Sequence, residues 1–214
     1  MNVIFGSAGF AKELDWLIYE IAEKTNIDYT PNYFVSKSDV GSTLNGKKII
    51  SEDEFLKIVE TGIPINVFLG VGSPTIKEKI YENLKQFENL NYPNLIHPNA
   101  IMDKREGMVK MGFGNVFFPS SVLTTYITIG NFVLLYLDCS VGHDTEIDNF
   151  TTISPGCHIS GNVKIGKTVY FGTGAVTVEK IEIKSNSIIG AGATVTNSIV
   201  EQGTYVGTPA KKIK

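Results

Sequence analysis

Residues 135–166 read LYLDCSVGHDTEIDNFTTISPGCHISGNVKIG and place an apolar residue at every sixth position. The register extends in both directions, from Met111 to Val195, and fourteen of its fifteen positions are apolar. Because 43% of the chain is hydrophobic, chance would fill about six or seven of the fifteen. Glycine often follows the apolar position, and a small or β-branched residue often stands two places before it, as at Ser121, Thr151, Val169, Ala175 and Ala193.

A strict period of six is neither the 3.6 of an α-helix nor the 2 of an ordinary strand. It fits a short strand followed by a corner, with three such units forming a coil of eighteen residues. Coils of this kind stack into a parallel β-helix, with the apolar column inside. Fifteen units predict five coils, about 24 Å tall at about 4.8 Å per coil. We expect the glycine after the column to adopt a corner conformation that a Cβ would hinder. Residues 103–108 break the register and predict a loop before the prism.

The first hundred residues instead alternate strand-like and helix-like segments. Apolar residues at helical spacing, from Leu14 to Ile21, predict a helix over residues 11–23, and Ser51 and Glu54 resemble a capping box before another. A third helix is expected over residues 74–87, and strands over residues 3–5, 32–35 and 65–71. This alternation predicts a small α/β domain with a Rossmann-like parallel sheet. Residues 94–100 would connect the two domains, which we place at 1–98 and 99–214.

Composition excludes several classes of protein. The formal net charge is −3 and no run of lysine and arginine occurs, so the basic footprint of a nucleic-acid-binding protein is absent. No apolar run reaches the roughly 18 residues of a membrane-spanning helix, so no membrane insertion is expected. The N-terminus lacks the basic start of a signal peptide. We therefore expect a cytoplasmic protein in which Cys139 and Cys157 are reduced thiols.

His143 is the most informative candidate for chemistry. It stands two residues after the inward Val141, so it should emerge at a corner and point outward. Gly161 follows eighteen residues later and should lie one coil away, at about 4.8 Å. An imidazole base beside a bare amide suits acyl transfer, because the N–H can hold the oxyanion, and Asp144 would orient the ring. The alternative is that His143 is simply an exposed corner residue.

The other histidines do not complete a metal site. His97, His143 and His158 are separated by 46 and 15 residues, and His97 falls outside the repeats, so a three-histidine zinc site is not expected. His158 precedes an inward residue and should face outward, either into the same cleft as His143 or into solvent.

Two glycine turns predict a ligand crevice in the N-terminal domain. Residues 6–9, GSAG, follow a strand and open a helix, so their backbone N–H groups are available to phosphate, although a tight strand-to-helix turn is an equal alternative. The full GxGxxG pattern is absent. A second turn at residues 70–72 ends another strand, and ligands bind at the carboxyl ends of such strands.

Nearly the whole chain resembles the bacterial sugar acyltransferases of the sialic acid O-acetyltransferase type, within the hexapeptide acyltransferases. GSAGFAKE resembles the family's start and LIHPNA its connector. GHD, SPGCHISGNVKIGKTVYFGTGAV and SIIGAGATVT resemble its catalytic coils, and YVGTPAKKI its tail. The group includes N-acetyltransferases of nucleotide-linked 4-amino sugars of the bacillosamine and perosamine type.

The resemblance implies a left-handed β-helix and a homotrimer with active sites between neighbouring prisms. Acetyl-CoA would lie along the coils, with His143 as the base, Asp144 as its partner and Gly161 at the thioester carbonyl. The acceptor's nucleotide would lie near Gly6, Ser7, Ala8, Gly9 and Gly72. Contacts to CoA would come from His158, Lys167, Ala191 and Lys211, with Lys184 and Lys212 as further candidates.

Four positions depart from the family pattern. Ser36 and Lys37 replace the acidic residues with which uridine-binding members hold the base, and Asp39 is a shifted substitute. Phe10 stands where a histidine is common, and Thr152 where some members place a second histidine in the acceptor site. The identity of the nucleotide therefore stays open, as does whether the acceptor is nucleotide-linked.

The predicted function is transfer of acetyl from acetyl-CoA to the amine of a nucleotide-linked amino sugar, for lipopolysaccharide or capsule biosynthesis. O-acetylation of a sugar hydroxyl with the same base is the close alternative. A non-catalytic β-helix that binds through its surface is a second class. Such surfaces usually show regular outward threonine or Asx ladders, whereas the outward positions here are mixed.

Overall fold

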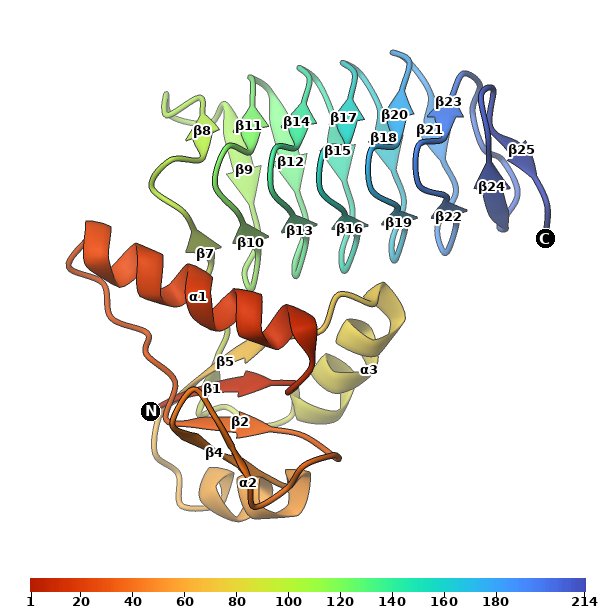
Figure 1. Cartoon of the computed structure of the whole chain (residues 1–214). Helices are drawn as coiled ribbons and strands as arrows, with labels where there is room; N and C mark the ends of the chain where they lie inside the picture. Colours follow the sequence, from red (N-terminus) through yellow and green to blue (C-terminus); the bar gives the residue numbers. More distant parts are fainter. The chain divides into compact units, whose positions relative to one another are not determined.

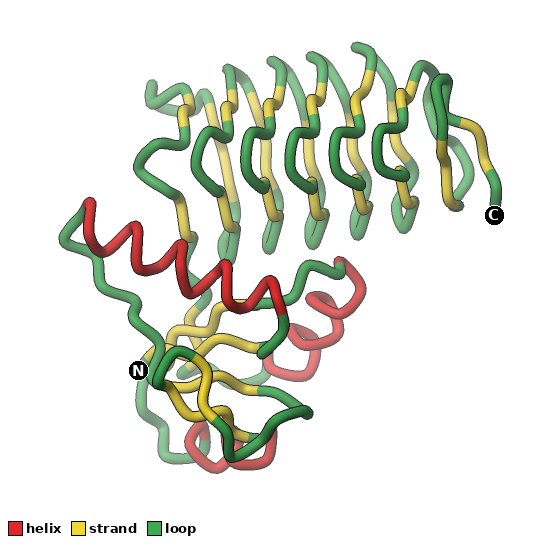
Figure 2. The backbone as a smooth tube through the Cα atoms, in the orientation of Figure 1, coloured by secondary structure: helices red, strands yellow, loops and turns green.

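The computed structural model describes residues 1–214, and the chain divides into two compact units. One unit contains residues 1–72 and 76–95, and the other contains residues 73–75 and 96–214. The first combines helices with a sheet, and the second is a stack of short strands joined by turns (Figures 1 and 2).

The N-terminal unit is built on a six-stranded sheet in the order β3-β4-β2-β1-β5-β6. Its centre is β1 (Asn2–Phe5), which pairs in parallel with β2 (Tyr33–Val35) and β5 (Ile65–Leu69). Beyond these lie β4 (Lys47–Ile50), β3 (Thr43–Leu44) and β6 (Leu90–Asn91), of which only β3 is antiparallel to its neighbour. The chain leaves β1 on one side and returns on the other, so the carboxyl ends of β1 and β5 form a topological switch point.

Three helices cover this sheet, and all three were predicted. Helix α1 (Gly9–Lys24) buries the apolar face expected from its periodicity, including Leu14 and Ile21. Helix α2 (Glu52–Val59) begins with the predicted capping box, with both hydrogen bonds between Ser51 and Glu54 present. Helix α3 (Pro74–Leu84) follows β5. The β4–α2–β5 and β5–α3–β6 connections run in the same direction across the sheet, so right-handed crossovers place α2 and α3 on one face and α1 on the other.

The C-terminal unit has three faces, each a stack of parallel strands. The first face contains β7 (Leu95–Ile96), β10 (Val116–Phe117), β13 (Leu134–Leu135), β16 (Thr152–Ile153), β19 (Tyr170–Phe171), β22 (Ile188–Ile189) and β24 (Thr204–Val206), with β25 (Lys211–Lys212) antiparallel at its end. The second contains β8 (Ile101–Met102), β11 (Val122–Leu123), β14 (Ser140–Val141), β17 (His158–Ile159), β20 (Val176–Thr177) and β23 (Thr194–Val195). The third contains β9 (Val109–Met111), β12 (Ile127–Ile129), β15 (Glu146–Ile147), β18 (Lys164–Ile165) and β21 (Glu182–Ile183).

The apolar column predicted from the six-residue period is the core of this prism. Each of its fifteen positions is the last residue of a strand, from Met111 in β9 to Val195 in β23. All except Met111 are buried, and Thr177, the one polar member, is 5% exposed. The small residues two places earlier, such as Ser121 and Ala175, are fully buried as well. The sequence pattern therefore predicted both the architecture and its core.

The start of the prism differs from the prediction. Residues 103–108 form a loop, but it lies within the first coil and not before it, because β7 and β8 already stack on β10 and β11. Ile96 and Met102 continue the column six residues apart, and Met111 follows nine residues later. The loop therefore inserts three residues into the six-residue period. This interruption is the reason that the period did not predict the first two sides of this coil. Residues 94–100, expected as a connection, accordingly contain β7.

The glycines after the column have a different role from the one predicted. They do not adopt positive φ; instead the next coil passes too close for a Cβ, which at Gly142 would lie 2.5 Å from the Gly161 nitrogen and at Gly172 2.6 Å from the Ala191 nitrogen. Positive φ occurs two residues further on, at the third residue after every column position from Gly114 to Gly192, with values of 55–70°. Each corner therefore needs both a close approach and one left-handed residue.

No helix of the protein combines the length and the apolar character that crossing a membrane requires.

Candidate active site

The turn between the second and third faces presents His143. Strands β14 and β17 pair in register, with Ser140 opposite His158 and Val141 opposite Ile159, so His143 lies beside Gly161. A Cβ on Gly161 would be only 2.7 Å from His143 Nε2, which shows that the imidazole rests on the glycine. The His143 side chain is 59% exposed. The predicted stacking across eighteen residues is confirmed, and the ring is accessible from outside the prism.

Asp144 fixes the orientation of this ring. It is one of the left-handed corner residues, with φ of 57°, and its Oδ2 lies 2.7 Å from His143 Nδ1. A neutral imidazole that donates its Nδ1–H to this carboxylate carries its lone pair on Nε2, the nitrogen nearer to Gly161.

The Gly161 amide donates no hydrogen bond within the chain. Equivalent amides in the turn between the third and first faces are satisfied by side chains one coil on: Phe113 N–H donates to Asn131 Oδ1, and Lys167 N–H donates to Ser185 Oγ. Glu179 stands one coil on from Gly161, but its carboxylate pairs with Lys180 and not with the Gly161 amide. The site therefore offers a proton acceptor at His143 Nε2 and a free donor at Gly161, the two groups that acyl transfer needs.

His158 lies on the same side of the prism as this pair. It is exposed on the second face, three residues before Gly161, and its Nδ1 lies 2.8 Å from Ser140 Oγ. The outward direction expected for His158 is confirmed.

The remaining candidate residues of the prism lie elsewhere. Lys167 is in the turn between the third and first faces, with Nζ 5.5 Å from the centre of the Phe150 ring. Thr152 is buried on the first face, at 2% exposure. Ala191 is exposed in the turn between the first and second faces, and Lys211 is on β25. Within one chain these residues do not meet His143. Of the two further lysines, Lys184 lines the groove described next and Lys212 forms an ion pair with Glu201.

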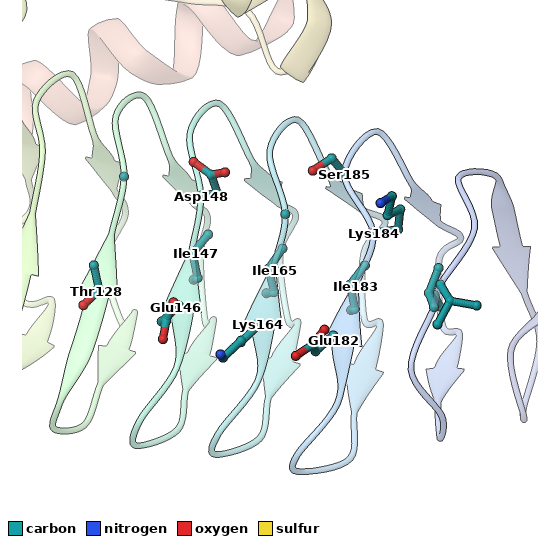
Figure 3. Close-up of a pocket in the computed structure, with 14 residues that line it drawn as sticks. Thr128, Glu146, Ile147, Asp148, Lys164, Ile165, Glu182, Ile183, Lys184 and Ser185 are labelled. Carbon is teal, nitrogen blue, oxygen red and sulfur yellow. The ribbon is translucent and has the colours of Figure 1, made fainter.

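A groove of about 550 Å³ runs along the third face (Figure 3). Successive coils place Thr128, Glu146, Lys164 and Glu182 side by side along it, and Val200 lies at one end. The charges alternate, so the groove offers no surface of one sign to a charged ligand. None of His143, Asp144 and Gly161 lines it. This groove is therefore separate from the candidate base.

The two glycine turns of the N-terminal unit do come together. Gly6 has φ of 119°, and a Cβ there would lie 2.6 Å from the Gly70 carbonyl oxygen. Beside them a cavity of about 310 Å³ opens at the carboxyl ends of β1 and β2 and is lined by Gly6, Ser36 and Lys37 among others. Ser7 Oγ donates to Ser36 Oγ at 2.9 Å. Ala8 and Gly9 form the start of α1, and the space around Gly72 is open.

Sequence reasoning missed the helical side of this cavity. Glu52 at the start of α2 and Ile76, Lys79 and Asn83 on α3 also line it. The available signal was Ile76, an apolar residue in the first turn of a helix that follows the glycine turn. It is 50% exposed and so contributes little to the core.

No group of three or more His, Cys, Asp or Glu side chains is placed to hold a metal ion in residues 1–214. Both cysteines are free and buried in the prism.

A prism of hexapeptide coils that presents an exposed His–Asp pair against a glycine amide, with an α/β unit in the same chain, resembles the hexapeptide-repeat acyltransferases. No family model matches the sequence. The chain is 28% identical over 218 residues to the GDP-perosamine N-acetyltransferase of Escherichia coli O157:H7, covering 99% of this chain and 95% of that protein.

Solved structures show the same similarity over the whole chain. The acetyltransferase domain of PglB from Neisseria gonorrhoeae FA1090, in complex with acetyl coenzyme A, is 28% identical with a TM-score of 0.82, covering 99% of this chain and 98% of that one. WeeI from Acinetobacter baumannii AYE is 27% identical with a TM-score of 0.87, covering 100% and 99%. These similarities confirm the resemblance to hexapeptide-repeat N-acetyltransferases of nucleotide-linked amino sugars.

Proposed function

We propose that this protein transfers the acetyl group of acetyl-CoA to the amine of a nucleotide-linked amino sugar, with His143 as the general base. The observation that carries the proposal is the contact of the His143 ring with Gly161, whose amide is unpaired, while Asp144 Oδ2 lies 2.7 Å from Nδ1. The full-length similarity to a GDP-perosamine N-acetyltransferase supports the substrate class.

In this mechanism the sugar amine attacks the thioester carbonyl and a C–N bond forms. The carbonyl oxygen becomes an oxyanion and accepts a hydrogen bond from Gly161 N–H. His143 Nε2 takes a proton from the attacking nitrogen, and Asp144 stabilises the resulting imidazolium. The C–S bond then breaks, and the CoA sulfur leaves with the proton from His143. The products are the N-acetylated sugar and CoA, and the base returns to its neutral form.

The nucleotide part of the acceptor would bind in the N-terminal unit. The turn that leads into α1, at the carboxyl edge of the sheet, consists of Gly6, Ser7, Ala8 and Gly9. The N–H groups at a helix N-terminus favour phosphate. Ser36 and Lys37 line the same cavity, and Lys37 adds positive charge. The space around Gly72 is open and would accommodate the sugar and the phosphates of the nucleotide.

The acetyl-CoA site would lie between neighbouring left-handed β-helices of a homotrimer. The expected contacts His158, Lys167 and Ala191 lie on different sides of one prism, and Lys211 lies on β25 at the end of the first face. One CoA molecule would reach such a set only where two prisms face each other. We place this enzyme in the cytoplasm, where acetyl-CoA and nucleotide sugars for surface glycans are made.

The test is a thiol-release assay with acetyl-CoA and a panel of sugars, each supplied as the amino sugar and as its hydroxyl analogue. The amino sugar should be the substrate. His143→Ala should lower turnover by about two to four orders of magnitude, and Lys110→Ala, an exposed change on the third face, should not. Release of CoA with the hydroxyl sugar alone would instead establish an O-acetyltransferase, and full turnover by the His143 variant would exclude the proposed base.

A further inference from the structure

The cavity beside Gly6 continues into a second one. A hollow of about 530 Å³ lies between α2 and α3, and it shares Phe5, Glu52, Ile80 and Asn83 with the cavity at the carboxyl edge of the sheet. The two are therefore parts of one crevice, which we call the α2–α3 crevice. It begins at the Gly6 turn and passes Glu52 and Asn83 where its two parts meet.

We propose that the α2–α3 crevice binds the base of the nucleotide and selects guanine, through Glu52 and Asn83. This inference rests on the proposed function, because it assumes a nucleotide-linked acceptor. It names the nucleotide, which the sequence leaves open.

The charged side chains of the crevice indicate where the phosphates of a nucleotide would bind and where its base would bind. Lys37 and Lys79 line only the outer part, beside the Gly6 turn. Glu52 lines both parts, and its carboxylate repels a diphosphate. The inner part also contains Lys85, but this lysine is paired with Glu82. The phosphates therefore belong at the Gly6 end, where the lysines and the start of α1 are, and the uncharged base belongs beside Glu52.

The Glu52 carboxylate is available to a ligand. It accepts no hydrogen bond within the chain, and its contact with Lys37 is a long one, 3.9 Å between Nζ and Oε1. The two side chains are 80% and 44% exposed, so this pair does little to hold the carboxylate. Apolar side chains also line this part of the crevice: Phe5 from β1, and Ile76 and Ile80 from α3. A flat aromatic base fits between such walls.

Hydrogen-bonding capacity then favours guanine over the other bases. A carboxylate only accepts, and guanine alone presents two adjacent donors, N1–H and the N2 amino group, on one edge. Uracil and thymine present one N–H between two carbonyl oxygens. Adenine and cytosine pair each donor with an acceptor that faces the carboxylate. The Asn83 amide can donate to guanine O6 on the same edge.

Calorimetric titration of the full chain with GDP, UDP, dTDP and ADP tests this. GDP should bind about 10-fold or more tightly than the others, the range that one bidentate base contact gives. Glu52→Gln should remove about 10-fold from GDP binding and leave UDP within about 2-fold. Asp53→Asn, the exposed neighbour that lies outside the crevice, is the matched control and should change neither.

Equal affinities for GDP and UDP would overturn the inference, as would an equal loss for all nucleotides in Glu52→Gln. Thermal unfolding of each variant shows that the fold is intact, and Asn83→Ala provides a second variant that should weaken GDP more than UDP. Because acetyl-CoA takes no part in the titration, a failure of acetyl transfer would refute the proposed function and leave the GDP preference standing. Preference for UDP would refute this inference even in an active enzyme.

Discussion

At the scale of single residues, the candidate site depends on the absence of one methyl group. The imidazole of His143 occupies the space that a Cβ on Gly161 would need, 2.7 Å from Nε2 and 2.8 Å from Cε1. At Gly142, the residue before His143, an added Cβ would meet backbone instead, with the Gly161 nitrogen 2.5 Å away. A side chain can rotate and a backbone cannot, so the two glycines should respond differently to the same change.

Gly161→Ala should therefore abolish most activity and keep the fold. The new methyl displaces the ring from the Gly161 amide, and a shift of about 1 Å in a catalytic group costs on the order of 100-fold in rate. Gly142→Ala should instead lower the thermal midpoint of unfolding, because two coils must move apart. Assays and melting curves of both variants check this. An active Gly161→Ala enzyme would mean that the ring and the amide do not act together.

Asp144→Asn tests the orienting carboxylate. The amide oxygen still accepts the Nδ1–H hydrogen bond now made at 2.7 Å, but the negative charge that stabilises the imidazolium is lost. We expect turnover to fall by about 10- to 100-fold with little change in the KM for acetyl-CoA, since the carboxylate acts after binding. A change confined to KM would assign Asp144 to ligand binding. Asp138→Asn, at the equivalent corner position one unit earlier, is the matched control.

The residues of the site differed in how far sequence could place them. His143, Asp144 and Gly161 were placed because a fixed period of eighteen converts sequence spacing directly into neighbours in space. Glu52, Ile76 and Asn83 belong to two helices of an α/β unit, where no period relates the helices. Their meeting depends on the crossover direction and on how α2 and α3 pack, which spacing does not give.

At the scale of elements, the corners were only half predicted. The left-handed residue at the third place after each column position has a sequence signal, since Asp138, Asp144, Asn162 and Gly174 are residue types that tolerate positive φ. Phe132 and Phe150 occupy the same place and obscure it; their rings stack at 5.2 Å. The hairpin of β3 and β4 was missed although it turns on Asn45-Gly46, both at positive φ, which is a strong hairpin signal.

Strand β18 allows a test of which side chains of a strand face the prism core and which face outward. Ile165 is 3% exposed in the prism core, and Lys164 beside it projects onto the third face. Ile165→Ala should lower the free energy of unfolding by about 2–5 kcal/mol, and Lys164→Ala by less than about 1 kcal/mol. Urea denaturation at one protein concentration measures both. Similar losses would contradict the alternation of the strand.

The buried cysteines predict a dependence of stability on pH. Burial raises the pKa of Cys139 to about 12 and that of Cys157 to about 11. Unfolded thiols ionise above about pH 8.5 while the folded ones stay protonated, so this contribution to the free energy of unfolding declines between about pH 8.5 and 12. By pH 10 the loss is at most about 2 kcal/mol per thiol.

The double variant Cys139→Ala/Cys157→Ala lacks this pH-dependent contribution to the free energy of unfolding. Alanine already occupies the equivalent places, at Ala175 and Ala193. The double variant should lose less stability than the natural chain between pH 7.5 and pH 10 in urea titrations. Burial lowers the pKa of Lys77 to about 7, which acts in the opposite direction, so the difference between the two proteins is the informative quantity. Parallel pH profiles would show that the thiols ionise equally in both states.

At the scale of the whole molecule, the acetyl-CoA site proposed here is made by more than one chain. His143 lies in the turn between the second and third faces, and Ala191 lies in the turn between the first and second, eight six-residue units further along the chain. If one CoA contacts His143 of one subunit and Ala191 of its neighbour, neither residue acts on its own chain. Sedimentation should then give a mass three times the 23.4 kDa of the chain.

Mixed trimers distinguish a shared site from a site within one chain. His143→Ala removes the base, and Ala191→Asp places a charge and added bulk against the cofactor; each change is at an exposed position and should leave the fold intact. Each variant alone should be inactive. When the two are unfolded together and refolded as a mixture, about a quarter of the sites between neighbours combine an intact His143 with an intact Ala191, because random assortment in a closed ring pairs the subunits in all four ways. Activity should then return to about a quarter of the natural level. If both residues served the same chain, every site would carry one of the two defects, and mixing would restore nothing.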